Sequence, residues 1–124
     1  MLLALAGRGQ IRADLGEYED ALEDLDRALS SQLTREEEAD VRSARALALA
    51  GLQRIREAEG ELSTALQMDP ERARTRLRAA RIAVILGDRD RMRTELERAL
   101  LSTPPLSFGE QESARRMLQQ LAET

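Results

Sequence analysis

Residues 16–31, GEYEDALEDLDRALSS, contain a helical pattern that the chain repeats twice more. Its apolar residues recur at helical spacing between acids and arginines, so one face of the predicted helix is apolar. The same apolar triplet occurs three times, at steps of 37 and 34 residues, as Leu25–Ala28–Leu29, Leu62–Ala65–Leu66 and Leu96–Ala99–Leu100. One helix pair cannot bury such a stripe alone, so the repetition indicates units that cover one another's faces.

The composition favours a closely packed helical core. Hydrophobic residues make up 42% and charged residues 34% of the 124 residues, which allows a core and excludes a disordered chain. The chain has one Tyr, one Phe and no Trp, so the core must consist mainly of Leu and Ala. It has no Cys and no His, which excludes disulfides, thiol catalysis and the commonest metal ligand.

The first residues, MLLALAGRG, lack the basic region of a signal peptide, and no apolar run approaches the roughly 18 residues of a membrane span. We therefore expect a soluble, cytoplasmic protein that does not enter a membrane. The absence of a capping residue before the first helix suggests a piece of a longer protein.

Charge is distributed unevenly along the chain. The net charge is −4, but residues 1–40 carry 4 Arg against 11 acids, whereas residues 70–100 carry 9 Arg against 5 acids. Such an asymmetry indicates oriented contacts or a charged groove. The alternative is that these charges form ordinary solvated helix faces.

The periodicity predicts seven helices. They are expected at about residues 2–15, 18–31, 35–51, 54–68, 70–86, 89–101 and 108–122. Gly16 and Gly87 are placed to end helices. The sequence between these positions contains almost no β-branched runs, so strands are not expected.

Several helix starts have a recognisable capping residue. Thr34 with Glu37 and Ser107 with Glu110 each fit a capping box. Asp69–Pro70 predicts a helix start at the proline, with the aspartate as its N-cap.

A 34-residue period with two helices per unit resembles the tetratricopeptide repeat (TPR) family. Three segments carry the family's turn and second helix: LGEYEDALEDLDRAL at 15–29, EAEGELSTALQMDP at 57–70 and LGDRDRMRTELERAL at 86–100. Gly9, Ala46 and Ala80 stand where the family needs small residues. Arg12, Arg89 and Met92 depart from the family's preferred residue types, so the third repeat is expected to pack more loosely at its turn.

The resemblance implies an all-α fold, a right-handed α-solenoid of three TPR helix hairpins plus a C-terminal capping helix. The repeats would occupy about residues 2–33, 35–69 and 70–103, the capping helix about 107–122, and the whole chain, 1–124, would form a single domain.

The resemblance also implies a function, protein–protein interaction, because the first helix of each pair in this family lines a concave groove for a peptide or partner helix. No cofactor or metal is expected. Mapped onto this chain, the predicted groove residues are Gln10, Asp40, Ser43, Leu47, Arg74, Leu77, Arg78, Arg81 and Val84. Leu47, Leu77 and Val84 would form an apolar floor.

The three arginines of this set are spaced i, i+4, i+7 and so share a helix face. Guanidinium groups suit bidentate pairing with carboxylates, which favours an acidic partner. The alternative is a solvated face whose arginine stems pack over Leu and Ala. The full carboxylate clamp of chaperone-binding relatives does not fit, because Ala6, Gln10 and Ala44 replace its other polar residues.

Two further functions stay open. The acidic N-terminal end of one chain could meet the Arg-rich third repeat of another, giving a homo-oligomer. The segment RARTRLRAAR, 72–81, could contact nucleic-acid phosphates, although the net negative charge and the lack of stacking aromatics argue against it. Catalysis is not expected, because the sequence shows no nucleophile with a base and no phosphate-binding loop.

Overall fold

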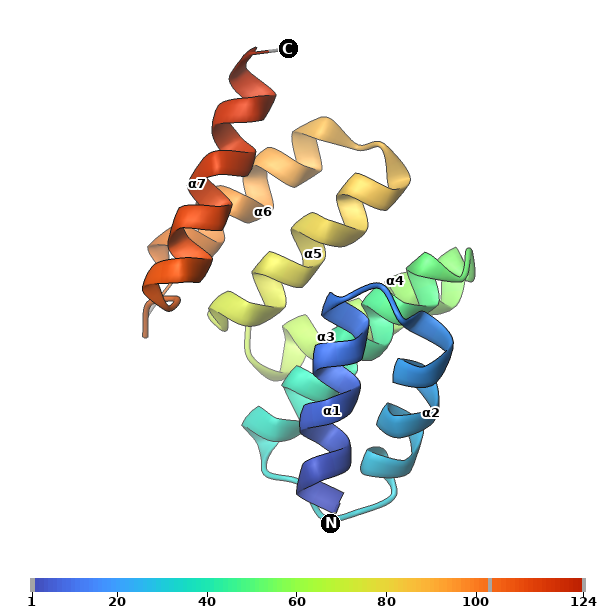
Figure 1. Cartoon of the computed structure of the whole chain (residues 1–124). Helices are drawn as coiled ribbons and strands as arrows, with labels where there is room; N and C mark the ends of the chain where they lie inside the picture. Colours follow the sequence, from blue (N-terminus) through green and yellow to red (C-terminus); the bar gives the residue numbers. More distant parts are fainter. Residues whose placement is uncertain (1, 103, 124) are drawn as a thin grey trace. The chain divides into compact units, whose positions relative to one another are not determined.

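The structure, a computed structural model, describes residues 2–102 and 104–123. Within these residues it contains seven helices and no strand (Figure 1). The helices are α1 (Leu2–Asp14), α2 (Tyr18–Leu29), α3 (Arg35–Gly51), α4 (Ile55–Met68), α5 (Ala73–Leu86), α6 (Arg89–Leu101) and α7 (Phe108–Glu123). The predicted all-α class and the seven predicted helices are confirmed.

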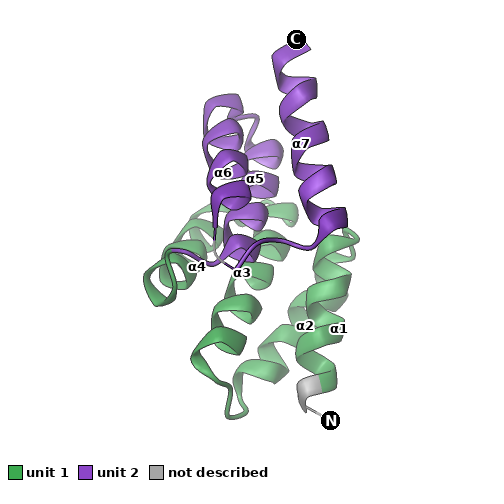
Figure 2. Ribbon diagram, turned by 90° about the vertical axis from the view of Figure 1, so that its left-hand side faces the viewer, with its two compact units in different colours: residues 1–70 green, residues 71–124 purple. Residues whose placement is uncertain are grey.

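The chain divides into two compact units, residues 1–70 and residues 71–124 (Figure 2). Unit 1 contains two helix hairpins, α1–α2 and α3–α4, and α3 also packs on α1 and α2. Unit 2 contains the hairpin α5–α6, and α7 packs on α6. The helices of each hairpin run antiparallel (Figure 1).

The second helix of each hairpin buries the apolar stripe that repeats in the sequence. In unit 1, Leu25 and Ala28 of α2 and Leu62 and Ala65 of α4 are buried. In unit 2, the core consists of residues from all three helices and of Leu106 in the connection between α6 and α7: Ala73, Leu77, Ala80, Leu96, Ala99, Leu106, Ala114 and Leu121. Burial of these stripes is the main term that stabilises the hairpins.

Close helix approach depends on glycine at two places in unit 1. A Cβ at Gly9 on α1 would lie 2.8 Å from the Leu25 side chain on α2. A Cβ at Gly51, the last residue of α3, would overlap the ring of Tyr18 on α2. The single tyrosine therefore packs directly against the α3 backbone.

The turn inside each hairpin uses a left-handed residue. Gly16, Gln53 and Gly87 have φ values of 84°, 65° and 72°, and they are spaced by the repeat steps of 37 and 34. A left-handed residue lets the chain leave the first helix and reverse direction. The second hairpin has Gln53 where the other two have a glycine.

Both predicted capping boxes are present. Thr34 Oγ1 accepts a hydrogen bond from the Glu37 amide at 3.1 Å, and Glu37 accepts one from the Thr34 amide at 2.8 Å. Ser107 and Glu110 exchange the same two bonds, both 3.2 Å long, at the start of α7.

The predicted helix start at Asp69–Pro70 is wrong. Asp69 is the C-cap of α4, Pro70 and Glu71 form a turn, and α5 begins at Ala73. Proline fits a turn as well as a first helical position, because both need its fixed φ.

Among the described residues, none of the helices has the length and apolar character needed to cross a membrane.

Candidate functional site

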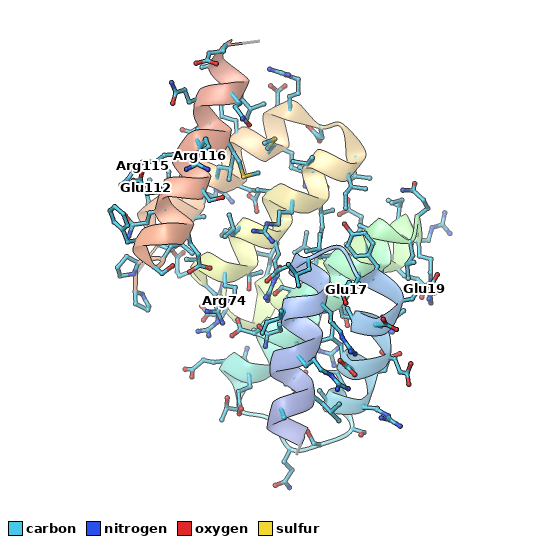
Figure 3. All side chains as sticks on the ribbon, in the orientation of Figure 1. Glu17, Glu19, Arg74, Glu112, Arg115 and Arg116 are labelled. Atoms are coloured by element: carbon cyan, nitrogen blue, oxygen red, sulfur yellow. The ribbon has the colours of Figure 1, made fainter. Side chains whose placement is uncertain are left out.

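The predicted groove residues of unit 2 all lie on α5, but they differ in accessibility. Val84 is 50% exposed, Arg74 is exposed and extends from the first turn of α5 (Figure 3), and Arg81 is half-buried. Leu77 and Arg78 are only 5% and 3% exposed. Leu77 belongs to the apolar core of unit 2, so its side chain packs in the interior and does not lie on the exposed surface of α5.

A pocket opens beside Val84. Its volume is about 310 Å³, enough to receive one large side chain. The lining residues come from the end of α5, the start of α6 and the last half of α7: Ala83, Val84, Gly87, Asp88, Arg89, Met92, Met117, Gln120 and Leu121. We call this the α5–α7 pocket.

The walls of the α5–α7 pocket are mainly apolar. Val84, Met92 and Met117 supply flexible or branched hydrocarbon, and methionine adapts readily to different side-chain shapes. The departure from the family pattern at Met92, a larger residue than the usual alanine, thus contributes to the pocket. A buried apolar side chain of a partner would gain about 1.5–3 kcal/mol at such a site.

Two charged residues at the rim have structural roles. The Arg89 side chain donates a hydrogen bond from Nη2 to the Leu121 carbonyl oxygen at 2.9 Å, near the C-terminal end of α7. A cation is favourable there because carbonyl groups at a helix end lack internal partners. Asp88 caps α6 by accepting from the Arg91 amide at 3.1 Å.

In unit 1, the predicted groove residues are mostly buried. Gln10 on α1 is half-buried, whereas Asp40, Ser43 and Leu47 on α3 are buried. The Ser43 hydroxyl donates to the Asp40 carbonyl oxygen at 3.0 Å, within its own helix. Binding roles for these four residues stay predictions.

Comparison with known proteins identifies the repeat. Residues 3–34 match the model of the tetratricopeptide repeat family. The chain is similar to a solved structure, the first TPR domain of the human RPAP3 protein, with a TM-score of 0.70 and 19% sequence identity. The match covers 99% of this chain and 91% of that one.

The family match lies in the first hairpin, and the structural likeness shows that the whole chain has the fold of a TPR domain. No curated protein matches the sequence significantly.

A repeated ion pair inside the TPR hairpins was missed by sequence reasoning. One carboxylate on each second helix is buried, at Asp24, Glu61 and Glu95. These residues are spaced by 37 and 34, and each directly precedes the repeated buried leucine. That spacing is the signal that could have revealed them.

Each buried carboxylate bonds to arginines of the first helix in its own hairpin. Asp24 accepts two bonds from Arg8 at 2.8 Å and one from Arg12 at 2.9 Å. The Arg8 hydrogen bond is the main reason that the pKa of Asp24 lies below its ordinary value of 3.8.

The second and third hairpins repeat this arrangement. Glu61 accepts from Arg42 at 2.9 Å and from Arg45 at 3.1 Å. Glu95 accepts from Arg76 at 3.2 and 3.3 Å. The pairs fix the register of the two helices in each hairpin, since a buried carboxylate without its arginine would be costly.

The same contacts bear on the nucleic-acid alternative. Of the five arginines in segment 72–81, Arg76 is held by Glu95 and Arg78 is buried.

The described residues contain no group of three or more carboxylates arranged to hold a metal ion.

Proposed function

We propose that this TPR protein is an interaction module or adaptor that binds a peptide or helix of a partner protein along α5 and in the α5–α7 pocket. The observation that carries the proposal is the pocket beside the exposed Val84. Affinity would come from one bulky apolar side chain of the partner placed among Val84, Met92 and Met117. Binding rather than catalysis is the expected activity, in the cytoplasm and without a cofactor.

Charge would orient the partner. Arg74 and Arg81 lie on the α5 face that leads to Val84, at spacings of seven and three residues along one helix side. Their positive charge favours acidic residues on one side of the partner's apolar anchor. Arg78 is buried, so its contribution would be to the local potential rather than to direct contact.

Selection from a random peptide display library tests this proposal. Recovered peptides should share a bulky apolar residue flanked by acids. Val84→Asp should abolish their binding, and Arg74→Glu should weaken it, while Leu101→Asp on the exposed surface of α6 leaves it unchanged. Recovery of peptides that bind wild type and Val84→Asp equally would reject the pocket as the site.

Self-association is a second candidate, supported by a separate acidic surface. Glu17, Glu19 and Asp20 are exposed and line a shallow pocket of about 350 Å³ at the α1–α2 turn (Figure 3). This surface could meet the Arg-rich face of a second copy. Light scattering at low and high salt distinguishes the two functions, because only a charge-driven dimer dissociates as salt rises.

A further inference from the structure

The α5–α7 pocket lies at a point of the repeat where unit 1 also has a pocket. Three neighbouring residues of the shallow pocket at the α1–α2 turn have equivalents in the α5–α7 pocket, one repeat step of 37 and one of 34 later. Gly16, Glu17 and Tyr18 correspond in this way to Gly87, Asp88 and Arg89. Both pockets therefore form where the turn of a hairpin lies beside the next first helix.

The residues of α7 follow the same register. Ala46 of α3, Ala80 of α5 and Ala114 of α7 are spaced by 34 and are each fully buried. On this register Gln120 of α7 corresponds to Leu52, the C-cap of α3, two steps of 34 earlier. Gln120 lines the α5–α7 pocket and Leu52 lines the pocket of unit 1, so the two pockets are equivalent on this side as well.

One position in this arrangement differs between the units. In unit 1 it is Tyr18, whose ring lies so close to Gly51 at the end of α3 that a Cβ there would overlap it. In unit 2 it is Arg89, which donates a hydrogen bond to the Leu121 carbonyl oxygen of α7 at 2.9 Å. Unit 2 therefore holds its next first helix without an aromatic ring, and Arg89 lines an open pocket.

The walls of the α5–α7 pocket suit an aromatic ring. Met92 and Met117 are half-buried and line the pocket, and thioether sulfur makes favourable contacts with aromatic rings. The guanidinium of Arg89 at the rim is attracted to the face of such a ring. An apolar cavity of about 150 Å³ already binds benzene, so about 310 Å³ leaves room for a phenyl or phenol group.

We propose that the α5–α7 pocket takes an aromatic side chain of the partner, the group that Tyr18 supplies from within the chain in unit 1. This inference rests on the proposed function and narrows its bulky apolar anchor to an aromatic one. A leucine in the pocket would remove water from the Arg89 guanidinium without offering it a π-face. In unit 1 the equivalent place is accessible although α4 follows α3, because Tyr18 is half-buried and lines a pocket there.

Two small probes separate an aromatic ring from apolar bulk. N-acetylphenylalanine amide and N-acetylcyclohexylalanine amide have rings of nearly equal size, but only the phenyl ring has a π-face. Each is titrated into the full chain, and binding is followed through the methyl NMR signals of Met92 and Met117, with Met68 on α4 as the reference. The phenylalanine amide should bind about two- to fivefold more tightly.

Variants of Arg89 show whether its charge recognises the ring. Arg89→Met removes the charge and should reduce the preference for the phenylalanine amide, whereas Arg89→Lys retains a cation and should keep it. Arg89 also holds Leu121, so a loosened α7 would weaken the binding of both amides together. The ratio of the two affinities therefore separates ring recognition from a purely structural role.

Equal or tighter binding of the cyclohexylalanine amide by the wild-type chain would overturn the inference. It would leave the proposed function standing, because an apolar side chain would still occupy the pocket. A preference that persists undiminished in Arg89→Met would remove Arg89 from the recognition of the ring. If neither amide shifts the Met92 or Met117 signal up to its solubility limit, the pocket binds no such side chain, and the inference and the proposed site are both rejected.

Discussion

At the scale of single residues, equivalent positions of the three hairpins share the same backbone conformation and the same kind of partner residue. The left-handed position of the hairpin turn is occupied by Gly16, Gln53 and Gly87. A side chain in this conformation costs roughly 1–2 kcal/mol, because its Cβ crowds the backbone. The second hairpin is therefore less stable with Gln53 at this position than it would be with glycine.

We expect Gln53→Gly to stabilise the protein by about 1 kcal/mol. The matched control is Ser63→Gly at an exposed position in the middle of α4, which should destabilise by about 0.5 kcal/mol because glycine is a poor helix former. Urea unfolding measures both changes. Two changes of the same sign would contradict the assignment of a left-handed turn.

The buried carboxylates make a pH-dependent contribution. Because the pKa of Asp24 is lowered by Arg8, its ion pair stabilises the fold above the ordinary pKa of 3.8. That stabilisation is lost as the pH falls through the lowered pKa of the folded state. Asp24→Asn removes the titrating group while keeping nearly the same shape.

Asp24→Asn should therefore lower the urea midpoint at about pH 7, and the gap to wild type should shrink progressively below about pH 4. Glu19→Gln, on the exposed surface of the same helix, should change little at either pH. A gap that persists undiminished in acid would mean that packing, rather than the ion pair, explains the loss.

At the scale of elements, α2 is held to α3 by the contact of Tyr18 with Gly51. Gly51→Ala should destabilise unit 1 by about 1–3 kcal/mol, because the tyrosine ring has to move. Gly60→Ala provides the control, since a Cβ there meets nothing within 4 Å and α4 gains a better helix former. Thermal unfolding should shift in opposite directions for the two variants.

The helices could be predicted because periodicity, capping boxes and turn glycines all agree along the chain. The start of α5 could not, since Asp69–Pro70 suits a turn and a helix start equally well. The exposed Val84 was predicted as a site residue, but the pocket beside it was not. Its other walls come from α6 and α7, which are brought to α5 only by packing. The burial of Arg78 could not be predicted either, because helical periodicity shows which residues share a face but not whether that face is covered.

At the scale of the whole molecule, the chain consists of two units with apolar cores of their own. Solenoid repeats contact mainly their neighbours, so a defect is felt most strongly in its own unit. Leu96→Ala should cost about 2–5 kcal/mol and accelerate amide hydrogen exchange in α5–α7 more than in α1–α4. Leu25→Ala should show the reverse distribution. Uniform acceleration by both variants would indicate a single cooperative unit.

Methionine methyl NMR shows directly whether a partner binds in the α5–α7 pocket. Met92 and Met117 line the pocket, whereas Met68 lies on α4 in unit 1 and serves as an internal reference. Titration with a peptide recovered from the display selection should shift the methyl signals of Met92 and Met117 and leave Met68 in place, with no shifts in Val84→Asp. Binding that shifts only the Met68 signal, or neither pocket methionine, would mean that the partner does not bind in the α5–α7 pocket.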